Sequence, residues 1–174
     1  MVLLVVDIQE QIIADMPNKA FNLIANVKRL INTARDNDLE VIYVRHDDGC
    51  NLTKGTVGFE IYSEIAPQMD EKIFDKYVNS AFRDTGLVEY LGRKNEKDIM
   101  IVGFLTDFCI DATIKCGFEH GYHMIVPEFC NSTFDNEYMG AEISYDYYNK
   151  KIWNTLFADC ISLEKAIELL NTSN

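Results

Sequence analysis

The 174-residue chain has no run of 18 apolar residues, so we expect no transmembrane helix. Its first residues, "MVLLVVDIQE", also lack three features of a secretory signal peptide. These are a basic start, a longer apolar segment and a small-residue cleavage site. We therefore expect a cytoplasmic protein that does not bind membranes.

Basic residues are scarce in this chain. Lys and Arg number 16 against 28 Asp and Glu, which gives a formal net charge of −12. Binding to nucleic acid needs clusters of Lys and Arg to neutralise phosphates, and anionic membranes need the same. We therefore expect a small-molecule ligand as the partner, with no nucleic acid.

The chain lacks paired cysteine motifs. There are five cysteines, an odd number, and no C-x-x-C motif occurs. This pattern indicates neither a disulfide framework nor a zinc finger. We expect four of them to be small buried hydrophobes, namely Cys50, Cys116, Cys130 and Cys160.

Strand and helix patterns alternate along the whole chain. We expect strands at 2–6, 40–44, 71–76, 98–104, 122–126 and 158–161. We expect helices at 17–37, 85–94, 107–119, 138–156 and 162–170, with Pro17 in a first turn and Ser162 as a cap. Such alternation predicts one α/β domain over 1–174, with a mostly parallel six-stranded sheet between two helical layers.

Three chemically active side chains come directly after predicted strands. They are Asp7 after the first strand, Lys76 after the third and Cys109 after the fourth. Because ligands bind at the carboxyl ends of parallel strands, these three are catalytic candidates. A helix N-terminus and the Lys76 ammonium would lower the thiol pKa, and Asp7 would take the proton. From position alone, a loop cap, a solvated lysine and a packed cysteine remain the alternatives.

The segments around these residues resemble the isochorismatase-like cysteine hydrolases, which include nicotinamidases and N-carbamoylsarcosine amidase. "VVDIQ" is similar to the family's strand ending in D-x-Q, and "KYVNSAF" to its K-x-x-x-S-x-F segment. "GFLTDFCIDAT" is similar to G-x-x-T-D-x-C-V-x-x-T. The resemblance implies a catalytic triad of Asp7, Lys76 and Cys109. It also implies strand order 3-2-1-4-5-6 and a homo-oligomer, a dimer or larger.

Two further features are implied by the resemblance. One is a cis peptide bond between Phe104 and Leu105, and the other is an oxyanion hole made by the N–H groups of Leu105 and Cys109. The chain departs from the family pattern at Cys116–Gly117 and at Phe129–Cys130, where the family often has Asp-Ala. Neither departure touches the triad.

No metal or other cofactor is expected. Nicotinamidases hold a metal through a D-x-H motif, but here "RHDD" places His46 before Asp47 and Asp48. The two other histidines, His120 and His123, lie elsewhere in the chain. For the substrate pocket we expect six residues near strand ends: Gln9, His46, Phe59, Tyr77, Phe82 and Phe134.

These features predict a hydrolase that cleaves a small-molecule amide, lactam or carbamoyl C–N bond through a thioester. One alternative is vinyl-ether hydrolysis of the isochorismatase type, although the cysteine in "TDFC" favours C–N cleavage. The other is a non-catalytic binding or redox-sensing protein with a reactive Cys109.

Overall fold

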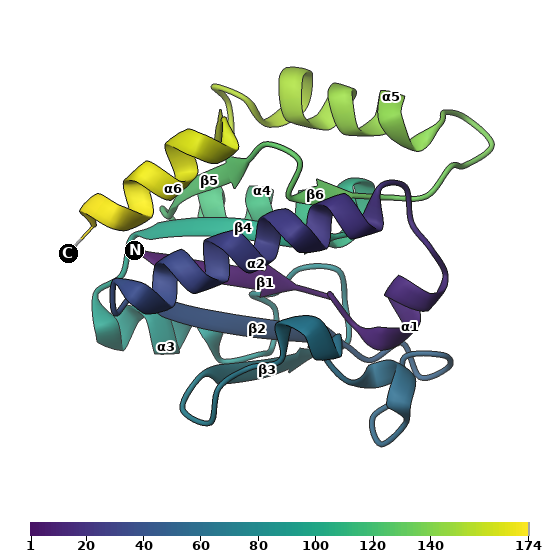
Figure 1. The fold of residues 1–174 in the computed structure, drawn as a ribbon, viewed down its shortest axis with the longest axis horizontal. Coiled ribbons are helices and arrows are strands. Elements are labelled where there is room, and N and C mark those ends of the chain that lie inside the picture. Colours follow the sequence, from purple (N-terminus) through teal and green to yellow (C-terminus); the bar gives the residue numbers. More distant parts are fainter. Residues whose placement is uncertain (174) are drawn as a thin grey trace.

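The apolar run after Met1 forms the central strand of a parallel sheet in the computed structural model, which describes residues 1–173. This strand, β1 (Val2–Val6), pairs with β2 (Glu40–His46) on one side and β4 (Asp98–Phe104) on the other. All five β1 residues are buried. Helices cover both faces of the sheet, which is why the strand is apolar without alternation (Figure 1).

The sheet has the predicted strand order. Its main path runs β3-β2-β1-β4-β5-β7, with β3 (Lys72–Lys76), β5 (His123–Pro127) and β7 (Asp159–Ile161). A short strand that the sequence did not predict, β6 (Asn131–Ser132), pairs with β4 beyond the end of β5. The six-stranded prediction is therefore confirmed in its order, and one two-residue strand is added to it.

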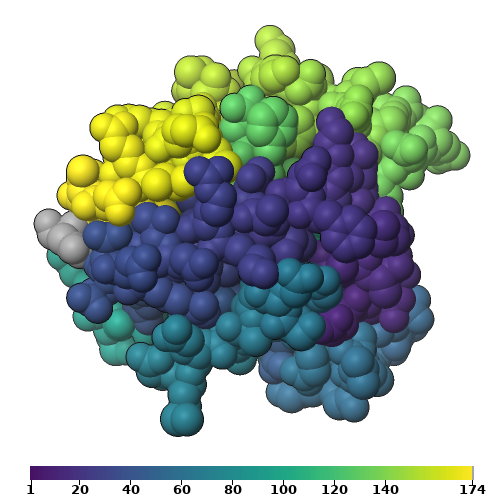
Figure 2. Space-filling view, viewed as in Figure 1, coloured from purple at the N-terminus to yellow at the C-terminus, as the bar shows by residue number. Residues whose placement is uncertain are grey.

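Two helical layers enclose the sheet. α2 (Ala20–Asp36) and α6 (Leu163–Thr172) pack on one face, and α3 (Leu87–Lys94) and α4 (Asp111–Glu119) on the other. Figure 2 shows α2 across the middle of the first face and α6, in yellow, beside it. α5 (Ala141–Asp146) lies beside β6 at one side of the molecule.

Several predicted boundaries differ from the observed ones. α2 begins after Lys19, whose backbone is left-handed, so Pro17 precedes the helix rather than entering it. A short helix that was not predicted, α1 (Glu10–Ala14), follows β1. Ser162 caps α6 as predicted, with its hydroxyl accepting from the Lys165 N–H at 3.2 Å.

π-Helical turns lie within two of the predicted helices. A π-helical turn (Thr106–Ile110) precedes α4, and another (Tyr147–Trp153) follows α5. The irregular segment 46–69 contains 3₁₀ turns at Val57–Phe59 and Ser63–Ile65. The predicted domain bound at Asn174 lies outside the described residues.

Gly103 lets the ends of β1 and β4 approach each other. Its φ is +130°, and a Cβ at this position would lie 1.9 Å from the Val6 carbonyl oxygen. No other residue fits between these two strands. Asp7 and the turn that carries Cys109 start from this pair, so the glycine sets how close they come.

A histidine bridge joins three parallel strands at their amino ends. His123 Nδ1 lies 2.8 Å from Asp98 Oδ1 of β4, and Nε2 lies 2.8 Å from Asp159 Oδ2 of β7. The hydrogen bond to Asp159, followed by that to Asp98, raises the pKa of the His123 ring. Because the pKa is higher in the folded state, the protonated ring stabilises the fold fully at pH values below the unfolded-state pKa of about 6.5. This stabilisation is lost as the pH rises through the folded-state pKa.

Replacing His123 with glutamine is therefore expected to lower the melting temperature at pH 6 more than at pH 9. The ring is half exposed, so the effect should stay below about 1 kcal/mol. Thermal melts of both proteins at the two pH values check this. An equal difference at both values would show that the ring charge contributes nothing.

Candidate active site

Three strand ends bring the predicted triad together. Asp7 Oδ2 lies 2.8 Å from Lys76 Nζ, and Lys76 Nζ lies 3.1 Å from Cys109 Sγ. Asp7 and Lys76 are buried to 1% and 0% exposure, and Cys109 to 7%. A buried ammonium of this kind needs an anion beside it, and Asp7 supplies one.

His46 joins the triad from the end of β2. Its Nδ1 lies 2.7 Å from Lys76 Nζ, 3.7 Å from Cys109 Sγ and 4.0 Å from Asp7 Oδ2. Burial first, and the charge of Lys76 second, lower the pKa of the His46 ring. The ring is therefore neutral at pH 7, and Nδ1 accepts a hydrogen bond from the ammonium.

The resting state of Cys109 differs from the sequence expectation. Burial, followed by the charge of Asp7, raises the pKa of the Cys109 thiol to about 12, and this outweighs the lowering effect of Lys76. The prediction of a lowered thiol pKa was therefore wrong. The sequence revealed the nearby cation, but it did not reveal that Asp7 already neutralises it in a buried site.

Charge counting explains how a thiolate can still form. Carboxylate, ammonium and thiol together have no net charge, and ionising the thiol into solvent would leave a buried negative charge. Moving its proton to Asp7 keeps the cluster neutral. Asp7 Oδ1 is buried and has no hydrogen-bond partner among the described residues, so it is free to accept that proton.

The turn that carries Cys109 has the expected backbone. The Phe104–Leu105 peptide bond is cis, as the resemblance implied. The Leu105 carbonyl accepts hydrogen bonds from the N–H groups of Phe108 and Ile110, both at 3.1 Å. These two bonds hold the turn from either side of Cys109.

Gln9 holds the end of β2 in place. Its Nε2 donates to the carbonyl oxygens of His46 at 3.0 Å and Phe59 at 2.8 Å, while its Oε1 accepts from the His46 N–H at 2.8 Å. Gln9 is fully buried, and so is Phe59, whose ring lies under the Arg45 guanidinium. Their contacts position His46 and the segment 46–69.

The other predicted pocket residues are dispersed. Phe82 stacks on Tyr122 at 5.4 Å, near the amino end of β5, whereas the triad lies at the carboxyl ends. Tyr77 is exposed beside Lys76, and Phe134 is half-buried in the segment after β6. The structure thus brings His46 to the triad and leaves Phe82 elsewhere.

One neighbour of Cys109 was missed. Asn79 Oδ1 lies 3.8 Å from Cys109 Sγ, and the Val78 carbonyl accepts from Lys76 at 3.2 Å. Both residues belong to the "KYVNSAF" motif. The signal for Asn79 was its place three residues after Lys76 in a segment already assigned to the site.

The remaining histidines do not form a metal set with His46. His120 lies against the Phe82 ring, and His123 is bonded to Asp98 and Asp159. A nicotinamidase-type arrangement of one Asp-x-His pair and further histidines therefore does not fit the described residues.

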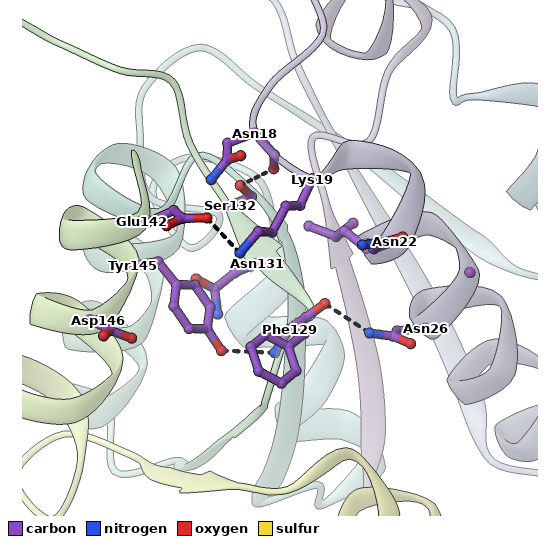
Figure 3. Close-up of a pocket in the computed structure, with 12 residues that line it drawn as sticks. Asn18, Lys19, Asn22, Asn26, Phe129, Asn131, Ser132, Glu142, Tyr145 and Asp146 are labelled. Carbon is purple, nitrogen blue, oxygen red and sulfur yellow. Dashed lines mark hydrogen bonds and ion pairs between the residues drawn. The ribbon is translucent and has the colours of Figure 1, made fainter. Parts of the chain in front are cut away.

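One cavity has a wall that includes none of the three triad residues. It measures about 540 Å³ and is bounded by the first turns of α2, by β6 and by α5 (Figure 3). Its wall mixes apolar surface with polar side chains, which include Asn18, Asn22 and an ion pair between Lys19 and Glu142. Asn131, which lines the cavity, accepts a hydrogen bond from Thr106 at 2.8 Å, and this bond connects the cavity to the turn that carries Cys109.

A buried acid, amine and thiol at the carboxyl edge of a parallel sheet are the parts of a cysteine hydrolase site. A family model for the isochorismatase domain matches residues 1–163. The chain belongs to the isochorismatase family, and its relatives there are hydrolases. No helix among residues 1–173 has the length and apolar character needed to cross a membrane.

Individual relatives are distant. Nicotinamidase 3 of Arabidopsis thaliana is 25% identical over 181 residues, which cover 95% of this chain and 87% of that protein. Secreted isochorismatase effector Isc1 of Verticillium dahliae is 29% identical over 106 residues, 59% of this chain. The match spans only 56% of the effector's length.

The same fold is found in solved structures. The crystal structure of N-carbamoylsarcosine amidase from Thermoplasma acidophilum superposes with a TM-score of 0.80 at 23% identity. The match covers 94% of this chain and 96% of that one.

Proposed function

We propose that this protein is a cysteine-dependent hydrolase of a small-molecule C–N bond in an amide, lactam or carbamoyl group. The observation that carries the proposal is the buried chain of contacts from Asp7 through Lys76 to Cys109. The activity named for the nicotinamidase relative supports the same bond class.

The first step of the proposed reaction makes the nucleophile. Asp7 accepts the proton of the Cys109 thiol, and Lys76 stays positioned between the two groups. The thiolate then attacks the carbonyl carbon, forming a C–S bond and placing negative charge on the carbonyl oxygen.

Backbone N–H groups would receive this charge. We assign this role to the backbone N–H groups of Leu105 and Cys109. Leu105 precedes the turn that contains Cys109, and its carbonyl accepts hydrogen bonds from that turn. Each hydrogen-bond donor of such an oxyanion hole lowers the activation free energy by about 3 kcal/mol. The turn is bonded through its own backbone, so the donors need no rearrangement during attack.

Asp7 then returns its proton to the leaving nitrogen as the C–N bond breaks. A water molecule gives a proton to Asp7 and attacks the thioester, and the C–S bond breaks to release the acid. The proton on Asp7 goes back to sulfur, which restores the resting thiol. One carboxylate thus serves twice as acid and twice as base.

Two alternatives are weaker on these observations. Vinyl-ether hydrolysis does not need a thiol nucleophile, yet Cys109 contacts Lys76 at 3.1 Å. A redox sensor needs an accessible thiolate, whereas Cys109 is 7% exposed and the pKa of its thiol is raised. A small-molecule substrate, with no nucleic acid, remains the partner that the acidic composition favours.

The test is a panel of small amides, lactams and carbamoyl compounds, assayed for release of ammonia or amine. Wild type and Cys109→Ala are measured side by side. Turnover by wild type alone supports the proposal, and turnover by both proteins excludes Cys109 as the nucleophile. A vinyl-ether substrate in the same panel tests the main alternative.

Hydrolysis is expected to survive a chelator. Each proposed step uses a side chain, a backbone N–H or water, so prior treatment with EDTA should leave the rate unchanged. The rate is measured before and after dialysis against EDTA. Loss of activity that returns with zinc, iron or manganese would show that "RHDD" holds a catalytic metal after all.

We also propose that the protein forms a homo-oligomer through the segments 46–69 and 127–150. Exposed apolar side chains in the second segment include Phe129, Ile143 and Tyr147. Sedimentation at micromolar concentration should therefore give a species heavier than the 20.0 kDa chain. Ile143→Glu should shift it toward the monomer, while Leu156→Glu, an exposed control outside both segments, should not.

A further inference from the structure

The catalytic cluster contains three different metal-ligating groups. Asp7, His46 and Cys109 each present one ligand atom, and these atoms all lie within 4.8 Å of one another. His46 Nδ1 is 3.7 Å from Cys109 Sγ and 4.0 Å from Asp7 Oδ2. In a tetrahedral zinc site, bonds of about 2.0–2.3 Å place such atoms roughly 3.3–3.8 Å apart.

A cation already occupies the centre of this set. Lys76 Nζ lies 2.8 Å from Asp7 Oδ2, 2.7 Å from His46 Nδ1 and 3.1 Å from Cys109 Sγ. To bind zinc at this position, the three ligands would have to close inward by less than about 1 Å. The ammonium thus stands where a metal ion would be.

The ligands are held by buried neighbours. The Gln9 side chain bonds both the N–H and the carbonyl of His46, which holds the backbone that carries the imidazole. Asp7 Oδ1 has no partner among the described residues, so it remains available to a water on the ion or to the ion itself. Such outer contacts strengthen metal binding by limiting ligand movement.

We propose that Asp7, His46 and Cys109 form a binding site for a thiophilic divalent cation such as Zn²⁺, which competes with the Lys76 ammonium for these three groups. The ion binds the sulfur as thiolate, so the thiol proton is released. Lys76 Nζ has to leave the centre of the cluster to make room for the ion, either as the ammonium or, after giving a proton to solvent, as the neutral amine. A divalent ion with one carboxylate and one thiolate leaves the ligand set neutral, as the resting triad is.

The set differs from a nicotinamidase-type site because it uses the nucleophile and the catalytic acid themselves. The inference rests on geometry and not on the proposed hydrolysis, since zinc binding is measured without a substrate. Its failure therefore leaves the proposed function untouched, and the reverse also holds.

The experiment uses the full chain with Cys50→Ser. The prediction that Cys50 is buried was wrong, because it lies exposed in the loop after β2, where its thiol would bind zinc adventitiously. Bound zinc is measured by equilibrium dialysis at buffered free Zn²⁺. Protection of Cys109 is measured by alkylation and mass mapping. One zinc per chain that protects Cys109, with no protection by Mg²⁺, supports the site.

Three variants make the test specific. His46→Phe should weaken zinc binding at least about tenfold, while His120→Gln, a histidine away from the cluster, should not change it. Lys76→Ala removes the competing cation and should bind zinc at least about tenfold more tightly, with a higher melting temperature when zinc is present.

Two outcomes would overturn the site. One is zinc that binds without protecting Cys109. The other is zinc affinity that is equal in His46→Phe and in its parent. If circular dichroism shows that Lys76→Ala is unfolded even with zinc, the zinc affinity of His46→Phe relative to its parent alone decides whether the site exists.

Discussion

Cys109→Ala is expected to lower hydrolysis by at least about 10⁴-fold while leaving the fold intact. The Asp7–Lys76 ion pair at 2.8 Å remains in this variant, so no buried charge loses its partner. Cys109→Ser should lose nearly as much, because a hydroxyl ionises far less readily than a thiol and donates its proton less readily to Asp7.

Steady-state rates with the best compound of the panel check this result, together with melting curves to confirm the fold. The triad acts as a unit, so adding Asp7→Asn to Cys109→Ala should cost little more than Cys109→Ala alone. A serine variant with turnover close to wild type would mean that sulfur does not attack the substrate.

Asp7→Asn is expected to lower hydrolysis by about 10²–10⁴-fold, because proton transfer in both directions depends on this carboxylate. At the same time, Cys109 should alkylate faster at neutral pH than in wild type. The charge of Asp7 is among the causes that raise the pKa of the Cys109 thiol, and its removal leaves the ammonium of Lys76 as the nearest charge. Lys76 then has a thiolate as its counterion.

The measurement is iodoacetamide labelling against pH in a Cys50→Ser background, with Cys109 identified by mass mapping. Lys76→Met is the matched control and should alkylate more slowly than the parent, since the stabilising cation is absent. Slower labelling of Asp7→Asn than of its parent would show that Asp7 generates a standing thiolate in the resting enzyme. The two readouts therefore separate nucleophile formation from proton transfer to the leaving group.

Local patterns in the sequence were enough to locate six of the seven strands and all three residues of the proposed triad. The run "VLLVV" forms a doubly buried strand, and the acid that follows it lies at the carboxyl edge of the sheet. Lys76 and Cys109 were located by the same rule. These predictions hold because parallel strands align their carboxyl ends whatever the details of packing.

Contacts between distant segments decided the role of the neighbouring residues. His46 and Gln9 both follow strand patterns, yet one meets the ammonium and the other bonds only backbone groups around it. Phe82 was expected beside the substrate and instead stacks on Tyr122. The direction of a side chain from a loop depends on the elements packed against it, which local sequence does not encode.

The sequence by itself determined the order of the sheet, the family and the three residues that meet at its edge. Only the tertiary structure decided that the pKa of the Cys109 thiol is raised. Because a pKa depends on burial and on the total charge within a few ångströms, the same cysteine beside the same lysine could have been a thiolate or a thiol. Burial together with the charge of Asp7 keeps Cys109 a thiol, and the Asp7 carboxylate is the neighbouring group that can accept its proton.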